Sequence, residues 1–394
     1  MTPTDEAGVV AAILGASGPL AIQGHGSKRA MLRPVQAAAT LSTAGLTGVT
    51  FYSPNELVIS ARAGTPIAEL RAVVAARGQH LIAEPPELGA LLGNDLAGTI
   101  GGAVATNLSG PRRVAWGAMR DHVIGLRAVN GRGDVLRAGG RVLKNVTGLD
   151  FCKLLSGSNG TLAVITEVIL KVLPAPERRA TLVLKGQNPA QAVAALSAAL
   201  GSPYAVSGAA WLPADLAERI PALAWLGGNA TLARLEDFAP SVAYRGERLR
   251  AELAEFGAVE MLDDAASVAI WADIGNVAPL VGAPGALWKI SVRPSQGPGV
   301  VAALQAIGAS CMLDWGGGLI WAAGPATEAT HAAVEAAAAA AGGVWTVMRA
   351  PDPLRSVVAV VPPDSAAMKA IAVRVKAAFD PRGILNPGRM VAGA

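Results

Sequence analysis

Apolar and polar positions alternate along much of the first half of the chain, and this alternation predicts strands. Residues 57–63 follow the period of two expected of a half-buried strand, and turn formers at 53–56 separate them from the apolar run 48–52. We therefore expect a hairpin over these residues. The same patterns predict further strands at 122–129, 134–138 and 161–173, and helices at 4–14, 66–77 and 148–155, the first two with Thr4 and Thr65 as their N-caps.

The pattern changes after Pro174 and Pro176, which indicates a domain boundary. Strands and amphipathic helices alternate beyond it, as is typical of an antiparallel sheet with helices on one face. The expected elements are strands at 180–185, 205–211, 287–292, 310–314 and 318–323, and helices at 189–200, 240–256, 298–308 and 326–341. We thus expect an α+β protein with three parts: residues 1–176, residues 177–378, and a C-terminal segment of turn formers at 379–394.

Composition and charge argue against several classes of protein. A net charge of +4 over 394 residues, without a dense run of Lys or Arg, does not favour nucleic-acid binding. No apolar stretch reaches the ~18 residues of a membrane-spanning helix. Asp5 and Glu6 stand where a signal peptide would carry basic residues, so we expect a cytoplasmic protein. Cys152 and Cys311 provide neither a disulfide framework nor a metal cluster, and we expect no metal.

Three clusters of glycine and small polar residues, at 24–27, 98–107 and 157–160, suggest binding of an anionic cofactor. Glycine lets backbone N–H groups converge on an anion without a Cβ in the way. We expect 98–110 to be tight, irregular backbone rather than a regular element. A dinucleotide-binding βαβ fingerprint does not fit the first cluster, because Arg29 stands where its third glycine should be. Taken alone, each cluster is better explained as a simple turn; the three in this order, with their flanking sequences, favour a cofactor site.

Three longer strings carry a family resemblance: GTIGGAVATNLSGPRR, RDHVIGLRAVNGRGDVLRAGG and KNVTGLDFCKLLSGSNGTLAVITEVILKVLP. Together with the terminal ILNPGR they resemble the FAD-binding domain of the vanillyl-alcohol-oxidase (PCMH-type) family, and within it the FAD-binding subunits of bacterial glycolate oxidases. The resemblance implies a PCMH-type FAD-binding domain of two subdomains, followed by an α+β cap domain with an antiparallel sheet.

The resemblance also implies which residues hold FAD. They would cradle the pyrophosphate, line the flavin and ribityl chain, hold the adenosine, or shape neighbouring loops: Gln23, Gly24, His25, Gly26, Ser27, Pro86, Gly101, Gly102, Ala105, Thr106, Asn107, Gly160, Val164, Ile165 and Asn386. Relatives that attach FAD covalently through the first loop have histidine right after its last glycine. Ser27 stands there in this chain, so we expect non-covalent FAD.

Oxidation of a 2-hydroxy acid needs a base for the hydroxyl proton and a cation for the carboxylate. Among the histidines, His122 is the candidate near the flavin, although the sequence favours a structural role for it; His80 and His331 are expected at the surface. The candidates for binding the carboxylate are Arg389 of the C-terminal motif and two arginines at strand ends of the cap, Arg293 and Arg349, which could also be plain surface charges.

The two cysteines cannot ligate an iron–sulfur cluster, so a reduced flavin on this chain would need a partner to take its electrons. The resemblance implies a hetero-oligomer with a second flavoprotein subunit and an iron–sulfur subunit, attached to a membrane through those partners. This chain would then oxidise glycolate or relay its electrons. Alternatives are a stand-alone FAD dehydrogenase of another hydroxy acid and a non-catalytic flavin-binding scaffold subunit.

Overall fold

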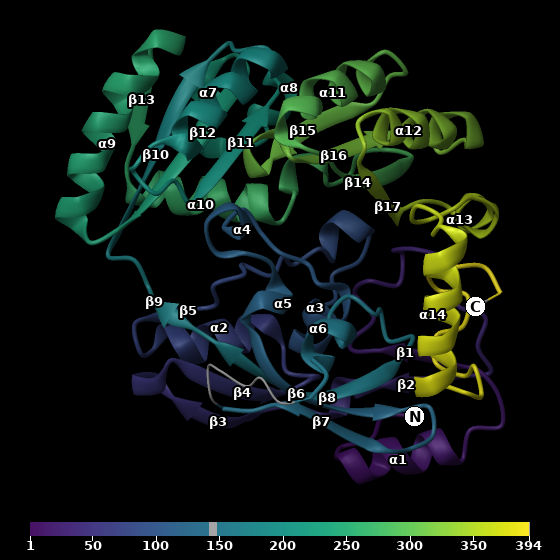
Figure 1. Ribbon diagram of the computed structural model, residues 1–394. Coiled ribbons are helices and arrows are strands. Elements are labelled where there is room, and N and C mark those ends of the chain that lie inside the picture. Colours follow the sequence, from purple (N-terminus) through teal and green to yellow (C-terminus); the bar gives the residue numbers. More distant parts are fainter. Residues whose placement is uncertain (142–147, 394) are drawn as a thin grey trace. The chain divides into compact units, whose positions relative to one another are not determined.

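The structure, a computed structural model, describes residues 1–141 and 148–393 (Figure 1). Residues 144–147 of the third resemblance string therefore lie outside it. The chain divides into two compact units: Met1–Ser109, Ala118–Ala175 and Pro363–Ala394 form the first, and Gly110–Gly117 and Pro176–Pro362 form the second. Residues 363–378, which the sequence pattern grouped with the cap, thus belong to the first unit. No helix among the described residues is long and apolar enough to cross a membrane.

The first unit is built on a five-stranded antiparallel sheet in the order β3-β4-β8-β6-β7. The predicted hairpin over 48–63 is confirmed, since β3 and β4 pair antiparallel across it. A second, parallel pair, β1-β2, and a short pair, β5-β9, complete the strands. Their bounds are β1 (Leu20–Gln23), β2 (Ala39–Ser42), β3 (Val49–Ser53), β4 (Val58–Arg62), β5 (Gln79–His80), β6 (Val123–Asn130), β7 (Val135–Gly139), β8 (Ala163–Lys171) and β9 (Leu173–Pro174).

Strand β8 separates two hydrophobic cores of this unit. Ile165 lies in the larger core, under α2 and α3, and Val164 lies in a smaller core beside α1, β1 and β2. This arrangement follows from the alternation of side chains along a strand, which here buries apolar residues on both faces. The helices are α1 (Glu6–Leu14), α2 (Ile67–Ala75), α3 (Ile100–Thr106), α5 (Met119–His122), α6 (Phe151–Leu155) and α14 (Ala366–Phe379).

The glycine-rich stretch 98–110, expected to be irregular, contains helix α3, so that prediction was wrong. Thr99 caps the helix by accepting the N–H of Gly102 at 3.1 Å. Small residues let the helix pack closely: a Cβ on Gly101 would lie 2.6 Å from that of Ala63. Tertiary packing therefore outweighs the low helix propensity of glycine here.

Two predicted N-caps are also corrected. Helix α1 is capped by Asp5, whose carboxylate accepts the N–H of Gly8 at 2.7 Å, rather than by Thr4. Helix α2 begins at Ile67, because the hydroxyl of Thr65 donates to the carbonyl of Arg62 at 2.7 Å instead of capping the helix.

The second unit is an eight-stranded antiparallel sheet in the order β13-β10-β12-β11-β15-β16-β14-β17, which confirms the expected α+β layer. Helices α7, α9, α11 and α12 lie along it (Figure 1). The strands are β10 (Arg178–Lys185), β11 (Gly208–Leu212), β12 (Ala230–Asp237), β13 (Val259–Leu262), β14 (Ala286–Ser291), β15 (Ser310–Asp314), β16 (Leu319–Gly324) and β17 (Val344–Arg349). The helices are α4 (Arg113–Trp116), α7 (Pro189–Gly201), α8 (Ala214–Ala217), α9 (Ala239–Leu253), α10 (Asp264–Gly275), α11 (Gly297–Gln305), α12 (Glu328–Ala340) and α13 (Asp352–Val357).

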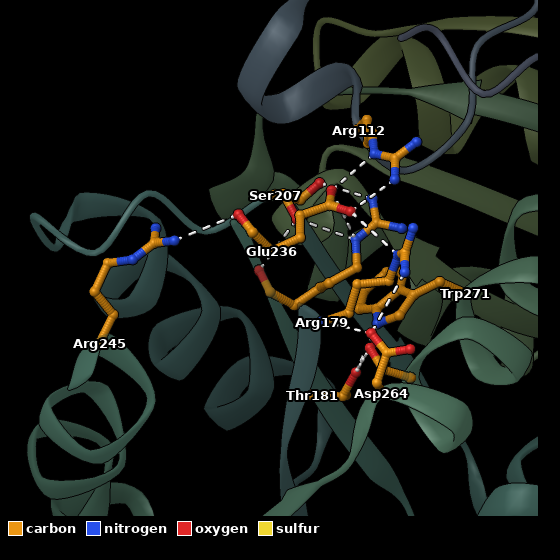
Figure 2. Close-up of polar contacts among 10 residues, drawn as sticks. Arg112, Arg179, Thr181, Ser207, Glu236, Arg245, Asp264 and Trp271 are labelled. Atoms are coloured by element: carbon orange, nitrogen blue, oxygen red, sulfur yellow. Dashed lines mark hydrogen bonds and ion pairs between the residues drawn. The ribbon is translucent and has the colours of Figure 1, made fainter. Parts of the chain in front are cut away.

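A buried ion cluster fixes the segment 110–117 in the second unit (Figure 2). Arg112 donates two hydrogen bonds to the carboxylate of Glu236, at 2.7 and 2.6 Å, and both side chains are buried. Arg234 lies 3.5 Å from the same carboxylate and over the ring of Trp271. Burial opposes ionisation of Glu236, but Arg234 and Arg112 outweigh it and hold the pKa of this carboxyl well below its ordinary value. The pair thus joins segments far apart in the sequence.

Candidate FAD-binding site

The first glycine cluster continues from the end of β1 and presses against the start of α3. A Cβ on Gly24 would lie 2.4 Å from Oγ1 and 3.0 Å from Cγ2 of Thr99, so glycine is required there by close approach. The hydroxyl of Ser42 donates to the carbonyl of Gly24 at 2.8 Å. The loop is therefore held from both sides at its first residue.

The third cluster packs against the other end of α3. The N–H groups of Gly157 and Asn159 donate to the carbonyls of Val104 and Ala105, at 3.0 and 2.7 Å. These bonds satisfy carbonyls that the last turn of a helix leaves without intrahelical partners. Helix α3 therefore lies between the first and third clusters and contributes most of the second. The structure brings together three glycine-rich segments that are distant in the sequence.

The C-terminal motif fastens this arrangement through Asn386. Its Oδ1 accepts the N–H of Ile22 at 2.7 Å, and its Nδ2 donates to the carbonyls of Ile22 and Asn159, at 3.2 and 2.8 Å. A Cβ on Gly160, which has φ +70°, would lie 2.9 Å from that Nδ2. Asn386 thus joins β1 to the third cluster. A direct contact between its side chain and FAD stays a prediction.

Arg389 of the same motif supports the continuation of the first loop. Its guanidinium donates to the carbonyls of Lys28 at 2.8 Å and Arg33 at 3.0 Å. The N–H of Arg33 in turn donates to the carbonyl of Arg389 at 3.1 Å. These bonds position the loop, and the carboxylate-binding role of Arg389 stays a prediction.

Lys28, which the sequence pattern did not single out, brings a cation into this region. Its Nζ would lie 3.8 Å from a Cβ on Gly102. Burial lowers the pKa of Lys28, and the nearby carboxylate of Glu87 opposes that shift. The signal in the sequence was its position directly after Ser27. A lysine held close to glycine backbone is a favourable partner for a diphosphate.

The remaining predicted residues of the first loop and of α3 make contacts that shape the site. The carbonyl of Ser27 accepts from Asn94 at 3.2 Å, and Nδ1 of His25 lies 3.1 Å from the carbonyl of Ala97. Thr106 donates back to the carbonyl of Gly102 at 2.7 Å. Asn107 ends α3 in the left-handed conformation, and its Oδ1 accepts the N–H of Arg120 at 3.0 Å.

Other predicted residues lie in the first unit as follows. Val164 and Ile165 bury their side chains in the two cores, which leaves the backbone of β8 as their means of contact with a ligand. Pro86 is buried in the loop that follows β5, and Gln23 is the half-buried last residue of β1. Their roles toward FAD stay predictions.

The histidines are placed differently from expectation in one case. His122 is buried and lines a small cavity with Leu81, Met119 and Leu170, surroundings typical of a core residue. His331 was expected at the surface, and this was wrong: it is buried, and its Nδ1 accepts the indole N–H of Trp288 at 3.2 Å. Because alanine occupies most positions of α12, the sequence did not indicate which face of this helix packs on the sheet.

The two cap arginines belong to the second unit. Arg293 is exposed at the end of β14. Arg349 donates to the carbonyl of Ala283, and its burial lowers its pKa. Neither arrangement shows a carboxylate site, and both roles stay predictions.

Residues 1–139 match the FAD binding domain family. Over 376 residues the chain is 35% identical to glycolate oxidase subunit GlcE of Escherichia coli (strain K12), a match that covers 95% of this chain and 93% of that subunit. The chain belongs to the FAD-binding family of GlcE. It is a flavoprotein of an oxidoreductase family, as the resemblance of its motifs predicted.

Two further likenesses concern a shorter stretch of sequence and the fold. A stretch of 90 residues is 44% identical to glycolate oxidase subunit GlcD of Bacillus subtilis (strain 168), covering 23% of this chain and 19% of that one. The 4-ethylphenol oxidase from Gulosibacter chungangensis superimposes with a TM-score of 0.70 at 13% identity, over 100% of this chain and 88% of that one. The latter confirms the predicted PCMH-type fold.

The residues present fit FAD. A Cβ on Gly24 would lie 2.4 Å from Thr99, and one on Gly101 would lie 2.6 Å from Ala63, so glycine lets the first loop pack on α3 and α3 pack beside β4. Lys28 supplies positive charge beside Gly102, which suits a diphosphate. The backbone and the cation of this cluster therefore suit an anionic cofactor such as FAD.

Proposed function

We propose that this protein is the FAD-bearing subunit of a complex that oxidises 2-hydroxy acids, with glycolate as its substrate and glyoxylate as product. The observation that carries the proposal is the 35% identity to GlcE over 95% of the chain. The convergence of the three glycine clusters on α3 supports it, because these are the segments that the family resemblance assigns to FAD.

In this proposal the chain's own residues bind and orient the cofactor. Backbone N–H groups of residues 24–27 and the ammonium of Lys28 hold the diphosphate. Thr99, Asn386 and Arg389 fix the loops through the bonds described above. FAD, when bound, supplies an acceptor for two electrons from the substrate.

The electrons must leave this chain through a partner. Its two thiols are poor ligands for an iron–sulfur cluster: burial raises the pKa of Cys152 to about 11 and that of Cys311 to about 12. We therefore infer an iron–sulfur subunit and a second flavoprotein subunit as partners. In this proposal the complex is cytoplasmic and meets a membrane through those partners.

We also propose that the FAD is not covalently attached. Ser27 occupies the position at which covalently flavinylated relatives carry histidine, and His25 lies on the other side of Gly26. A serine hydroxyl is not the nucleophile that such a linkage uses.

The test is to purify the FAD-loaded chain, alone and with its co-eluting partners, and to add glycolate, D-lactate or L-lactate without oxygen. Loss of the visible flavin absorption with glycolate in the complex supports the proposal. Bleaching of the isolated chain shows that it oxidises substrate itself, whereas bleaching in the complex alone indicates a relay. A complex that none of these acids reduces refutes the proposal.

A matched pair of variants tests the assignment of the cofactor site. Gly102→Val places a branched side chain 3.1 Å from Oγ1 of Thr99 and toward Lys28, and should abolish FAD retention. Gly299→Val changes an exposed position of α11 with nothing within 4 Å of the new Cβ, and should leave the flavin content unchanged. Equal flavin content in the two variants would contradict the assignment.

A further inference from the structure

Lys289 lies on the face of the second unit's sheet that turns away from α12. Its neighbour in β14, Trp288, is fully buried and donates to His331 of α12 at 3.2 Å. Successive side chains of a strand point to opposite faces, so Lys289 points to the other face. Its cross-strand neighbours there are Trp321 of β16 and Thr346 of β17.

The ring of Trp315 contacts two cations on this face. Nζ of Lys289 lies 5.3 Å from the centroid of the Trp315 ring, and Cζ of Arg113 lies 4.5 Å from it. Two hydrogen bonds hold Trp315 in place: its indole N–H donates to the carbonyl of Gly110 at 3.2 Å, and its backbone N–H donates to the carboxylate of Asp314 at 2.7 Å. Both cations therefore contact the same aromatic ring.

The ammonium of Lys289 has donors to spare. Within residues 1–141 and 148–393, no hydrogen bond or ion pair engages its Nζ, which lies over the Trp315 ring. Burial, reinforced by the charge of Arg113, lowers the pKa of Lys289 to about 8. An ammonium with three N–H donors in such a place is stabilised by an anion.

We propose that Lys289, together with Arg113, binds the carboxylate of the 2-hydroxy acid substrate. This inference rests on the proposed function. A carboxylate between the two cations offsets their mutual repulsion and accepts hydrogen bonds from both. The indole rings of Trp315 and Trp321 shield the site from water, which strengthens these charge interactions.

The affinity for a carboxylate should depend on pH through Lys289. An anion favours the protonated lysine, so affinity is full below pH 8 and falls as the pH rises through about 8. The other charged groups on this face include Arg113 and the cluster of Arg112, Arg234 and Glu236, whose carboxyl has its pKa held well below its ordinary value. Guanidinium groups and an ionised Glu236 do not titrate near pH 8, so the decline reports Lys289.

Calorimetric titration of the FAD-loaded full chain with sodium glycolate tests the proposal. Lys289→Met should weaken glycolate binding by about tenfold to a hundredfold, the usual effect of losing a charge-assisted hydrogen bond. Lys185→Met, at an exposed end of β10, should bind as the wild type does. Ethylene glycol, which lacks the carboxylate, should not bind.

Two further measurements keep the outcome decisive. Arg113→Gln should also weaken glycolate binding, and Lys289→Arg should restore much of it, whereas a merely structural lysine would show neither effect. Unchanged affinity in Lys289→Met, or a wild-type chain that binds no carboxylate, overturns the proposal. Loss of complex assembly with intact glycolate binding would instead show that Lys289 receives an acidic side chain of a partner, and this too overturns it.

The failure of this inference can be distinguished from failure of the proposed function. If the complex oxidises glycolate and Lys289→Met leaves its KM unchanged, the carboxylate site is wrong and the function stands. If the wild-type complex oxidises no 2-hydroxy acid, the function is wrong, whatever Lys289 binds.

Discussion

Replacing Gly24 with alanine should disturb the FAD loop through one identifiable contact. The new Cβ would lie 2.4 Å from Oγ1 and 3.0 Å from Cγ2 of Thr99, so rotating the threonine exchanges one close contact for another. Gly24 does not have a positive φ, and the cost is therefore the contact itself and not the backbone conformation. Overpacking of this kind costs about 1–3 kcal/mol.

A double-mutant cycle with Thr99→Ala isolates that contact. Thr99→Ala alone loses the N-cap of α3 and should cost about 1 kcal/mol. In the double variant the clash is relieved, so the total should be smaller than the sum by at least ~0.5 kcal/mol, the limit of ordinary additivity. Gly299→Ala, at an open position of α11, is the matched control and should be neutral or stabilising by up to about 1 kcal/mol.

The assays are denaturant unfolding of the FAD-free chain and titration with FAD. Each kcal/mol by which the new Cβ destabilises the bound conformation of the first loop should appear as a loss of FAD affinity. Gly24→Ala should therefore bind FAD at least about fivefold more weakly than the wild type. Additive effects of Gly24→Ala and Thr99→Ala, or a neutral Gly24→Ala, would refute the proposed packing of the first cluster on α3.

Three further predictions concern the buried ion cluster around Glu236, the contacts of Asn386 and the linkage of the cofactor. Glu236→Gln should destabilise the folded chain by about 3–5 kcal/mol in denaturant unfolding, because it leaves buried arginines uncompensated, whereas the exposed Glu247→Gln should change little; a small effect at Glu236 would contradict its burial. Because the pKa of Glu236 is depressed in the folded state, its contribution is present above the unfolded-state value of about 4.3 and is lost as the pH falls below it, which acid titration of both variants will show. Asn386→Ala removes the partners of part-buried backbone groups of Ile22 in β1 and should cost about 1–3 kcal/mol together with FAD affinity; normal FAD binding would argue against a role of Asn386 in holding β1 to the third cluster. Because this chain has Ser27 where covalently flavinylated relatives have histidine, acid precipitation of the wild-type protein should release all FAD into the supernatant. A yellow pellet would disprove non-covalent binding.

The sequence alone determined those features that depend on local period and local conformational freedom. Alternation over 48–63 specified the hairpin of β3 and β4, because a strand must repeat every two residues to bury one face. The glycine clusters marked the segments that we predict to bind FAD, because a missing Cβ is a property of the residue itself. Family resemblance assigned these clusters to one cofactor, which local pattern alone could not do.

The tertiary structure decided everything that depends on which segments meet. The contact of Asn386 with Ile22 joins residues 364 positions apart, and no local pattern encodes such a pairing. Residues 98–110 contain a helix because Gly101 packs on Ala63, a neighbour that propensity does not consider. The burial of His331 and the contact between Lys289 and Trp315 likewise depend on which side of the sheet each side chain occupies and on what packs there. Packing free energy is shared among distant residues, so its outcome is visible only in the folded chain.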